Sequence, residues 1–373
     1  MGAGGETGAG GETGENLAPQ APKASQTSQA PEALIASITR PELNEFYSEN
    51  NRLMRSIVSI INYRTPQLVV ECLASLENEV EVGRDRVVVV DNASGDDSVE
   101  VLQRAIAERQ WESWAEVFPS TVNGGFSAGH NLVLKNYTAD TYLLLGSDTI
   151  VRPGAFKALF EAVKAHPEVG IFGPRLEWPD TTPQVSCFRY RSPIGELIGS
   201  ANTGPITKLF ADRDVVIPVS DTSIETEWIS FACVLIRREV IEKIGLMDEG
   251  YFMYFEDIDY CRRTQAAGWK IRYWPQARVV HLKGGSGPVQ ASMAERKRPP
   301  AYLYASRSRY FTKFYGATGL LQANLCWLAG RGVSFGRELV GNKKPHICQN
   351  QAQDIWINWQ DPMKQPTLPG AKT

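Results

Sequence analysis

The order of apolar and polar positions predicts an alternation of strands and helices that begins near residue 57. Apolar runs of about four to six residues between polar turns are typical of strands buried on both faces of a parallel sheet. Such runs predict strands over Ile57–Asn62, Arg86–Asp91, Thr141–Leu145, Val169–Phe172, Gln184–Phe188, Phe231–Ile236 and Arg278–His281.

Between these runs, apolar residues recur three and four positions apart, as they do on one face of a helix. A strand–helix alternation predicts an α/β fold, Rossmann-like, whose mostly parallel central sheet is flanked by helices and followed by a C-terminal helical extension. The helices are expected from Pro66 through Leu76 and over Ser98–Gln110, Gly154–His166, Arg238–Ile244, Asp257–Ala267, Ala301–Tyr315 and Gly319–Ala329.

Composition and charge divide the chain into three parts. Residues 1–50 repeat AGGETG and continue as a Gln/Ala/Pro/Ser-rich stretch, which cannot bury enough apolar surface to fold, so we expect a disordered tail there. Residues 51–287 carry the alternating pattern and are expected to form the main domain. Residues 288–373 are expected to form a basic helical extension and tail, and from Ser286 onward twelve basic residues stand against four acidic ones.

Composition also limits the class of protein. The net charge of −3 argues against a generally basic nucleic-acid binder. The six cysteines include no C-x-x-C pair, which argues against a zinc ribbon or a disulfide framework and favours a reducing, cytoplasmic compartment. We find no secretory leader and no uncharged apolar run of about 18–20 residues that would span a bilayer.

Polar residues follow three of the predicted strands, where an open α/β sheet binds its ligands. A carboxylate at such a place can accept hydrogen bonds from a base or ribose, or hold a divalent cation that bridges a diphosphate. The alternative is that these residues are helix N-caps, a role that Asn, Asp and Ser favour. The residues are Asn62 and Tyr63, then Asp91 and Asn92, then Ser147 and Asp148.

A glycine-rich loop, NGGFSAGHN at residues 123–131, runs into a predicted helix. Glycine lets the backbone approach a ligand closely, and a helix N-terminus attracts phosphate. The spacing matches neither G-x-G-x-x-G nor G-x-x-x-x-G-K-[ST], so neither the dinucleotide fingerprint nor the P-loop is present.

Acidic residues follow a dense aromatic cluster in the segment YFMYFEDIDYC at 251–261. Carboxylates beside apolar walls can have a raised pKa, as a general base requires, although acids also stabilise a helix N-terminus simply by their charge. His281 ends the last predicted strand, where a histidine serves equally well as a metal ligand or as a structural group.

Taken in order, these segments resemble the inverting glycosyltransferases of family 2, which have the GT-A fold, and within them the bacterial rhamnosyltransferase-like branch that builds surface polysaccharides. The resemblance runs from about Ile57 to Tyr315. It depends on IINY at 60–63, VVDNASGDDS at 89–98, NGGFSAGHN at 123–131, LLLGSDT at 143–149, GLMDEGYFMYFEDIDYCRR at 245–263 and VVHLKGGS at 279–286.

The resemblance implies a role for each matching residue. Asp257 would be the general base, with Glu256 beside it, while Asp148 and His281 would hold Mg²⁺ or Mn²⁺. Trp228 and Asp259 would contact the acceptor. The nucleotide-sugar donor would be bound by Asn62, Tyr63, Asp91, Asn92, Asn123, Gly125, Asn131, Ser147 and Asp148.

One position departs from the family pattern. The D-x-D signature would place an acid at residue 146, where this chain has glycine, so Gly146-Ser147-Asp148 offers a single carboxylate. The phosphates of the sugar nucleotide would then have to supply further metal ligands.

The resemblance further implies transfer of rhamnose or another hexose from dTDP-rhamnose or a UDP-hexose to a saccharide or polyprenyl-diphosphate-linked acceptor. The rival interpretations are a non-catalytic nucleotide-sugar-binding protein and a sugar-1-phosphate nucleotidyltransferase. The nucleotidyltransferase would need a glycine-rich basic loop after the first strand, where this chain has NYRTP at 62–66.

The basic C-terminal segment leaves two interpretations open. Its apolar helix, over Gly319–Ala329, is too short to span a bilayer but long enough to lie on one, which would place the protein peripherally at the inner face of the plasma membrane. The alternative is a helical cap that packs on the main domain while its basic residues stay in solvent.

Overall fold

A computed structural model describes residues 54–282, 288–341 and 345–366, which all belong to one compact unit. The predicted disordered tail (1–50) and the glycine-rich residues after His281 lie outside the described residues. Among the residues described, no helix combines the length and hydrophobicity needed to cross a bilayer.

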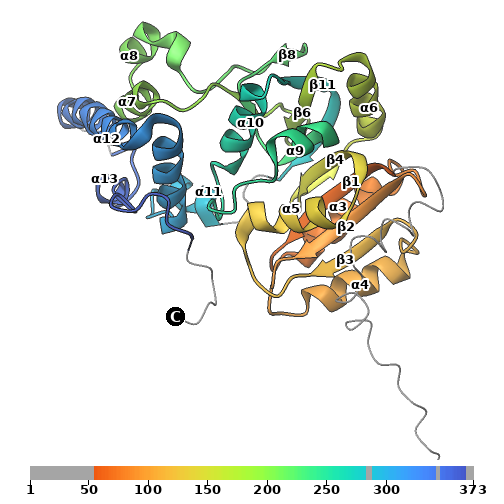
Figure 1. Cartoon of the computed structure of the whole chain (residues 1–373). Helices are drawn as coiled ribbons and strands as arrows, with labels where there is room; N and C mark the ends of the chain where they lie inside the picture. Colours follow the sequence, from red (N-terminus) through yellow and green to blue (C-terminus); the bar gives the residue numbers. More distant parts are fainter. Residues whose placement is uncertain (1–53, 283–287, 342–344, 367–373) are drawn as a thin grey trace, which may run out of the picture. The chain divides into compact units, whose positions relative to one another are not determined.

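The expected α/β architecture is confirmed: a mostly parallel sheet is flanked by helices and followed by a helical stretch (Figure 1). The strands are β1 (Met54–Asn62), β2 (Asp85–Asp91), β3 (Ala115–Pro119), β4 (Ala139–Gly146), β5 (Thr149–Val151), β6 (Val169–Glu177), β7 (Cys187–Phe188), β8 (Ile224–Glu225), β9 (Trp228–Ile229), β10 (Cys233–Arg237) and β11 (Lys270–His281). The helices are α3 (Pro66–Leu76), α4 (Ser98–Glu108), α5 (Gly125–Asn136), α6 (Ala155–Ala165), α7 (Pro193–Ala201), α8 (Gly204–Leu209), the 3₁₀ turn η1 (Ala211–Arg213), α9 (Arg238–Ile244), α10 (Glu256–Ala266), α11 (Pro288–Ala294), α12 (Ala301–Gly341) and α13 (Gln351–Asp354).

The main sheet has the order β3-β2-β1-β4-β10-β6-β11-β5, with β8 paired to β11. Strands β1 to β4 are parallel, and β11 is parallel to β6. Strand β10 runs antiparallel between β4 and β6. The carboxyl ends of β1, β2 and β4 therefore meet at one edge, where the polar residues predicted from the sequence lie.

Side chains of each central strand alternate between two apolar cores, one on each face of the sheet. In β2, Val87 and Val89 pack into the core with α3, α4 and α6, whereas Val88 and Val90 pack into the core with α5, α9, α10 and α12. Burial on both faces explains the uninterrupted apolar runs that identified these strands.

Several predicted bounds are corrected by the structure. Of the predicted strand Gln184–Phe188, only Cys187–Phe188 pairs as a strand, β7, and the Gln184 side chain donates to the His281 carbonyl of β11. Helix α5 begins at Gly125, so most of the predicted glycine-rich loop is helical. The predicted helix Gly319–Ala329 continues to Gly341 within α12, which breaks at Gly316, where φ is 72°.

Helix α12 is tied to the main domain through the loop that precedes α10. Asp248 in that loop accepts hydrogen bonds from Arg309 and Lys313 at 2.8 and 2.7 Å, and Ser306 donates to the Met253 carbonyl at 3.0 Å. Because these residues hold the wall of the site described next, the C-terminal extension contributes directly to its shape.

Candidate active site

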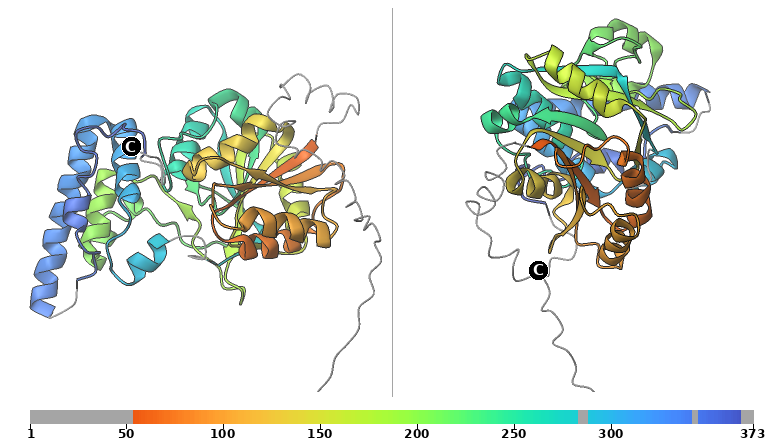
Figure 2. Two further views of the ribbon diagram at one scale, coloured as in Figure 1. Left: turned by 90° about the horizontal axis from the view of Figure 1, so that it is seen from below. Right: turned by 90° about the vertical axis from the view of Figure 1, so that its right-hand side faces the viewer.

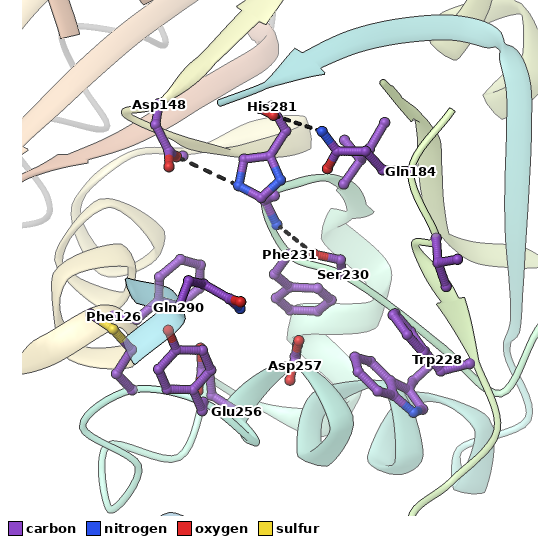
Figure 3. A pocket seen from close by; sticks show the side chains of 17 residues that line it. Phe126, Asp148, Gln184, Trp228, Ser230, Phe231, Glu256, Asp257, His281 and Gln290 are labelled. Atoms are coloured by element: carbon purple, nitrogen blue, oxygen red, sulfur yellow. Dashed lines mark hydrogen bonds and ion pairs between the residues drawn. The ribbon is translucent and has the colours of Figure 1, made fainter. Parts of the chain in front are cut away.

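Two adjoining cavities open at the carboxyl edge of the sheet and share Phe126, Gly146 and Met253 in their walls. The larger, about 310 Å³, is lined by Asp148, Glu256, Asp257 and His281, and we call it the carboxylate cavity (Figure 3). The smaller, about 260 Å³, is lined by Tyr63, Asn92, Asn123, Gly125 and Ser147, and we call it the asparagine cavity.

The asparagine cavity is built on a bonded amide network between the end of β2 and the start of α5. Asn92 Nδ2 donates to Asn123 Oδ1 and to the Gly125 carbonyl, both at 3.0 Å, and the Gly125 amide donates to Asn123 Oδ1 at 3.0 Å. Asn92 Oδ1 is buried and accepts no hydrogen bond from the described residues.

Sterically, only glycine fits at position 125. Its φ is +81°, and a Cβ atom there would lie 1.9 Å from the Phe252 carbonyl oxygen, which accepts a hydrogen bond from the Phe126 amide at 2.8 Å. The loop before α10 can thus approach α5 closely only because residue 125 lacks a side chain.

Two predicted donor-binding residues lie behind the cavity walls. Asp91 Oδ1 accepts from Asn62 Nδ2 at 2.7 Å and from Ser94 Oγ at 2.6 Å, and Asp91 Oδ2 accepts from the Ser94 amide at 3.1 Å. Neither Asn62 nor Asp91 lines either cavity. Their bonds fix the end of β2 and thereby position the neighbouring Asn92.

Asp148 and His281 meet at the rim of the carboxylate cavity, as Figure 3 shows. His281 Nε2 lies 3.8 Å from Asp148 Oδ1, and the Leu282 amide donates to the Asp148 carbonyl at 2.8 Å. Gln184 Nε2 donates to the His281 carbonyl at 2.8 Å and fixes the end of β11. The antiparallel pairing of β11 with β5 brings together two residues that are distant in sequence.

Glu256 and Asp257 open helix α10 on the far side of the same cavity. The two residues before them, Tyr254 and Phe255, have φ values of 68° and 69°, a left-handed conformation that bulky residues rarely adopt. Strain of this kind persists where the surrounding structure enforces it, and it occurs often at active sites.

Burial shifts the protonation of both acids. It raises the pKa of Asp257 to about 6, against the lowering effects of the Ile258 amide and the nearby Arg191 charge. Burial, together with the neighbouring Asp257 charge, raises the pKa of Glu256 well above its usual range, and Glu256 Oε2 is buried without a hydrogen-bond partner among the described residues. A carboxyl with a pKa near 6 is ionised at neutral pH yet basic enough to accept a proton.

The other predicted residues fall into two groups. Trp228 lines the carboxylate cavity, stacks on Phe188 with ring centroids 4.2 Å apart, and donates through Nε1 to the Arg189 carbonyl at 2.9 Å. Asn131 and Asp259 line neither cavity. Asn131 bonds the Met247 backbone, and Asp259 pairs with Arg263 at 2.7 Å, so both residues hold the structure around the site.

Several lining residues were not predicted from the sequence, and three of them carry polar groups on segments distant from the predicted motifs. Gln184 and Gln290 line the carboxylate cavity, and Tyr302 of α12 lines the asparagine cavity, where its ring lies 5.3 Å from that of Phe252. They come from irregular or distant segments with no local periodicity. For Asp259, which was predicted to contact the acceptor but lines neither cavity, a sequence signal existed: a residue two positions after Asp257 points to another side of the helix.

Comparison with known proteins is consistent with this geometry. A family model described as glycosyltransferase-like family 2 matches residues 55–300. An N-acetylglucosaminyl-diphospho-decaprenol L-rhamnosyltransferase of Mycobacterium tuberculosis is 31% identical over 170 residues, which cover 44% of this chain and 54% of the relative. The low-salt glycan biosynthesis hexosyltransferase Agl10 of Haloferax volcanii is 23% identical over 231 residues, 60% of this chain and 66% of the relative.

The chain thus spans about half the length of the mycobacterial relative. Among solved structures, GalNAc-T7 with UDP, GalNAc and Mn²⁺ superposes with a TM-score of 0.52 at 13% identity, covering 83% of this chain and 59% of that one, a likeness of fold. The match of the family model over most of the described domain, together with this fold, shows that the chain belongs to the glycosyltransferase-like family 2 and has the GT-A fold.

Proposed function

We propose that this chain is an inverting glycosyltransferase that moves rhamnose or another hexose from a nucleotide-diphosphate sugar to a saccharide or lipid-linked saccharide acceptor in surface polysaccharide biosynthesis. The observation that carries the proposal is the placement of Asp257 across one cavity from Asp148 and His281 (Figure 3). That arrangement leaves space between a base and the groups that would face a leaving diphosphate.

In this proposal the asparagine cavity binds the nucleoside of the donor. Tyr63 offers an aromatic ring, and the amide groups of Asn92 and Asn123 in the cavity wall would hydrogen-bond the base or ribose. Ser147, which lines the asparagine cavity and precedes Asp148 of the carboxylate cavity in the sequence, would contact the first phosphate. The names of the relatives, an L-rhamnosyltransferase and a hexosyltransferase, favour rhamnose or another hexose as the transferred sugar, and dTDP-rhamnose or a UDP-hexose is the donor we propose.

The charge of the cavity walls supports a divalent cation. No lysine or arginine is among the described residues that line the two cavities, although a diphosphate is an anion. Residues 54–282, 288–341 and 345–366 hold no group of three or more metal-ligating side chains. Asp148 and His281, whose Oδ1 and Nε2 atoms lie 3.8 Å apart, would hold an Mg²⁺ or Mn²⁺ ion, which would supply positive charge to stabilise the leaving diphosphate.

The chain's own residues would perform the proton transfer. Asp257 accepts the proton of the acceptor hydroxyl while that oxygen attacks the anomeric carbon and the bond to the diphosphate breaks. One displacement inverts the anomeric centre, so no carboxylate nucleophile is required. Trp228, held by its stack on Phe188, would bind the apolar face of the sugar being transferred or of the acceptor.

Thermal unfolding with a panel of nucleotide sugars, with and without Mn²⁺, tests the proposal. A bound donor at 100 times its Kd should add about 2.7 kcal/mol of stability. Asp148→Asn should lose the part of that gain that depends on Mn²⁺. No stabilisation by any nucleotide sugar would overturn the proposal.

Assays of the products separate the rival functions. Stabilisation without nucleoside diphosphate release, even with acceptor saccharides, would indicate a non-catalytic nucleotide-sugar-binding protein. Synthesis of a nucleotide sugar from a nucleoside triphosphate and a sugar 1-phosphate would indicate a nucleotidyltransferase.

A further inference from the structure

Helix α12 exposes a broad apolar flank after its break at Gly316. Leu325, Phe335 and Leu339 are 53%, 52% and 67% exposed, although leucine and phenylalanine are normally among the residues a fold buries. The other large apolar side chains exposed on residues 317–341 are Leu321, Leu328, Val333 and Val340.

These positions form one continuous face. At about 100° per residue, they and the exposed small residues between them cover an arc of about 160° around the helix axis. The arc contains no charged residue, and its polar members are Thr318 and Gln322. An apolar surface of this width on a soluble domain marks a place of contact.

The charged residues of the same segment point the other way. Arg331 pairs with Glu338 at 2.8 Å, and Arg337 donates to the Asn202 carbonyl at the end of α7. The opposite flank packs closely on α7, because a Cβ at Gly330 would lie 2.2 Å from Ser200 Oγ. In Figure 2 (left), α7 covers the inner flank of α12, and no described element covers the outer one.

We propose that this outer flank of α12 lies on an anionic lipid bilayer, with its apolar side chains at the boundary between headgroups and acyl chains. The flank is wider than the seam of a two-helix contact, whose flanking positions would carry charges rather than Ala329, Val333, Gly336 and Val340. Arg307, Arg309 and Lys313 are bonded within the fold, but Arg331 and Arg337 border the arc at about 120° to either side of its centre. Lys343 and Lys344 follow the helix in the sequence, and cations beside an apolar face complement anionic headgroups.

The inference deepens the proposed function, on which it rests for its purpose. A lipid-linked acceptor would reach the site while the enzyme lies on the surface that holds it. The helix does not cross the bilayer in this arrangement; it lies along it, and α7 occupies the side that solvent would otherwise face.

Flotation of the full chain with vesicles of phosphatidylcholine and phosphatidylglycerol tests the inference. The wild-type chain should float with the vesicles, and Leu325→Glu combined with Phe335→Glu should reduce the floated fraction about tenfold, because two charges would enter the apolar boundary. Val82→Glu is the matched control: Val82 is 59% exposed and distant in sequence from α12, and flotation should stay within about twofold.

Three results would overturn the inference: no flotation of the wild-type chain at low salt, equal flotation of the double variant, or a wild-type dimer that the double variant converts to monomers. The last result would assign the flank to contact between two copies. Nucleotide-sugar stabilisation measured on the same variants separates the two proposals, because it should persist when flotation is lost. If nucleotide sugars did not stabilise the wild-type chain although it floated with the vesicles, only the proposed function would be overturned.

Discussion

The asparagine cavity and the carboxylate cavity share a wall but differ in how their polar groups are satisfied. In the first, Asn92, Asn123 and the Gly125 backbone are bonded to one another. In the second, Glu256 and Asp257 are buried next to each other at the end of a strained turn.

The difference indicates separate tasks. A bonded network holds its shape without a ligand, so binding there costs little reorganisation. Two neighbouring buried carboxyl groups are unfavourable for the free protein, and such groups persist in folded proteins mainly where the reaction needs them. The first cavity therefore suits recognition of the donor, and the second suits chemistry. Four predictions test this division, in order of their expected effect on transfer.

Replacing Asp257 should have the largest effect. Asp257→Asn keeps the size of the side chain and removes the base, so transfer should fall by about 10²–10⁴-fold, while nucleotide-sugar binding in the adjoining cavity should change little. The measurements are initial rates with saturating donor and thermal stabilisation by the donor.

Glu256→Gln is the matched control for Asp257→Asn. If turnover survived in Asp257→Asn and was lost in Glu256→Gln, the base would be Glu256. Asp259 is not a candidate, because its carboxylate is held by Arg263 and Lys313 away from the cavity.

A methyl group at Gly125 should damage donor binding rather than chemistry. In Gly125→Ala the new Cβ would meet the Phe252 carbonyl, so the loop must move away from α5, and donor affinity should fall about tenfold or more. Gly83→Ala is a close control, because Gly83 has the same φ of +81° with nothing within 4 Å of the added atom. Equal donor affinities in the two variants would show that the close approach has no role.

Activity should decrease on the acid side of a pKa of about 6. Asp257 must be ionised to accept a proton, so kcat/KM should fall about tenfold between pH 7 and pH 5.

Because the pKa of Asp257 is raised in the folded chain, its contribution to stability is present below pH 3.8 and is lost as the pH rises through about 6. Asp257→Asn should therefore raise the melting temperature relative to wild type more at pH 8 than at pH 5.

A pH–rate profile with no limb between pH 5 and 7 would contradict this assignment of the base. The same limb retained in Asp257→Asn at full amplitude would assign the titration to another group.

The sequence predicted the central sheet well because burial on both faces leaves an uninterrupted apolar run, as in Arg86–Asp91, which lies within β2. It missed β3, a short edge strand whose five residues are mostly half-exposed and carry no such run. Helix α7 also escaped: Ile194, Leu197, Ile198 and Ala201 follow helical spacing, but Gly195 and Gly199 stand between them and weaken the pattern.

For the site, residue type predicted the chemistry but not the direction of each side chain. Parallel pairing places Asn62 opposite Asp91, and two polar groups so placed bond to each other instead of to a ligand. Gln184 and Tyr302 reach the cavities from segments that only the folded chain brings near. Contacts of that kind depend on strand register and helix packing, which local patterns do not encode.

The contact between Asp248 and α12 should have the smallest effect on transfer, because it acts on the cavity walls only through the loop before α10. Hydrogen bonds from Arg309 and Lys313 outweigh burial and lower the pKa of Asp248 to about 2. Asp248→Asn leaves the charges of Arg309 and Lys313 without this carboxylate, so it should cost about 2–3 kcal/mol of stability. It should also raise the KM for the donor a few-fold. Asp221→Asn removes an exposed partner of Arg175 and should change the melting temperature by less than about 1 °C. If Asp248→Asn lowered the melting temperature without changing KM, α12 would stabilise the domain while leaving the asparagine cavity unaffected, and the wall contributed by Tyr302 would be held by its contacts with Phe252 and Tyr254 alone.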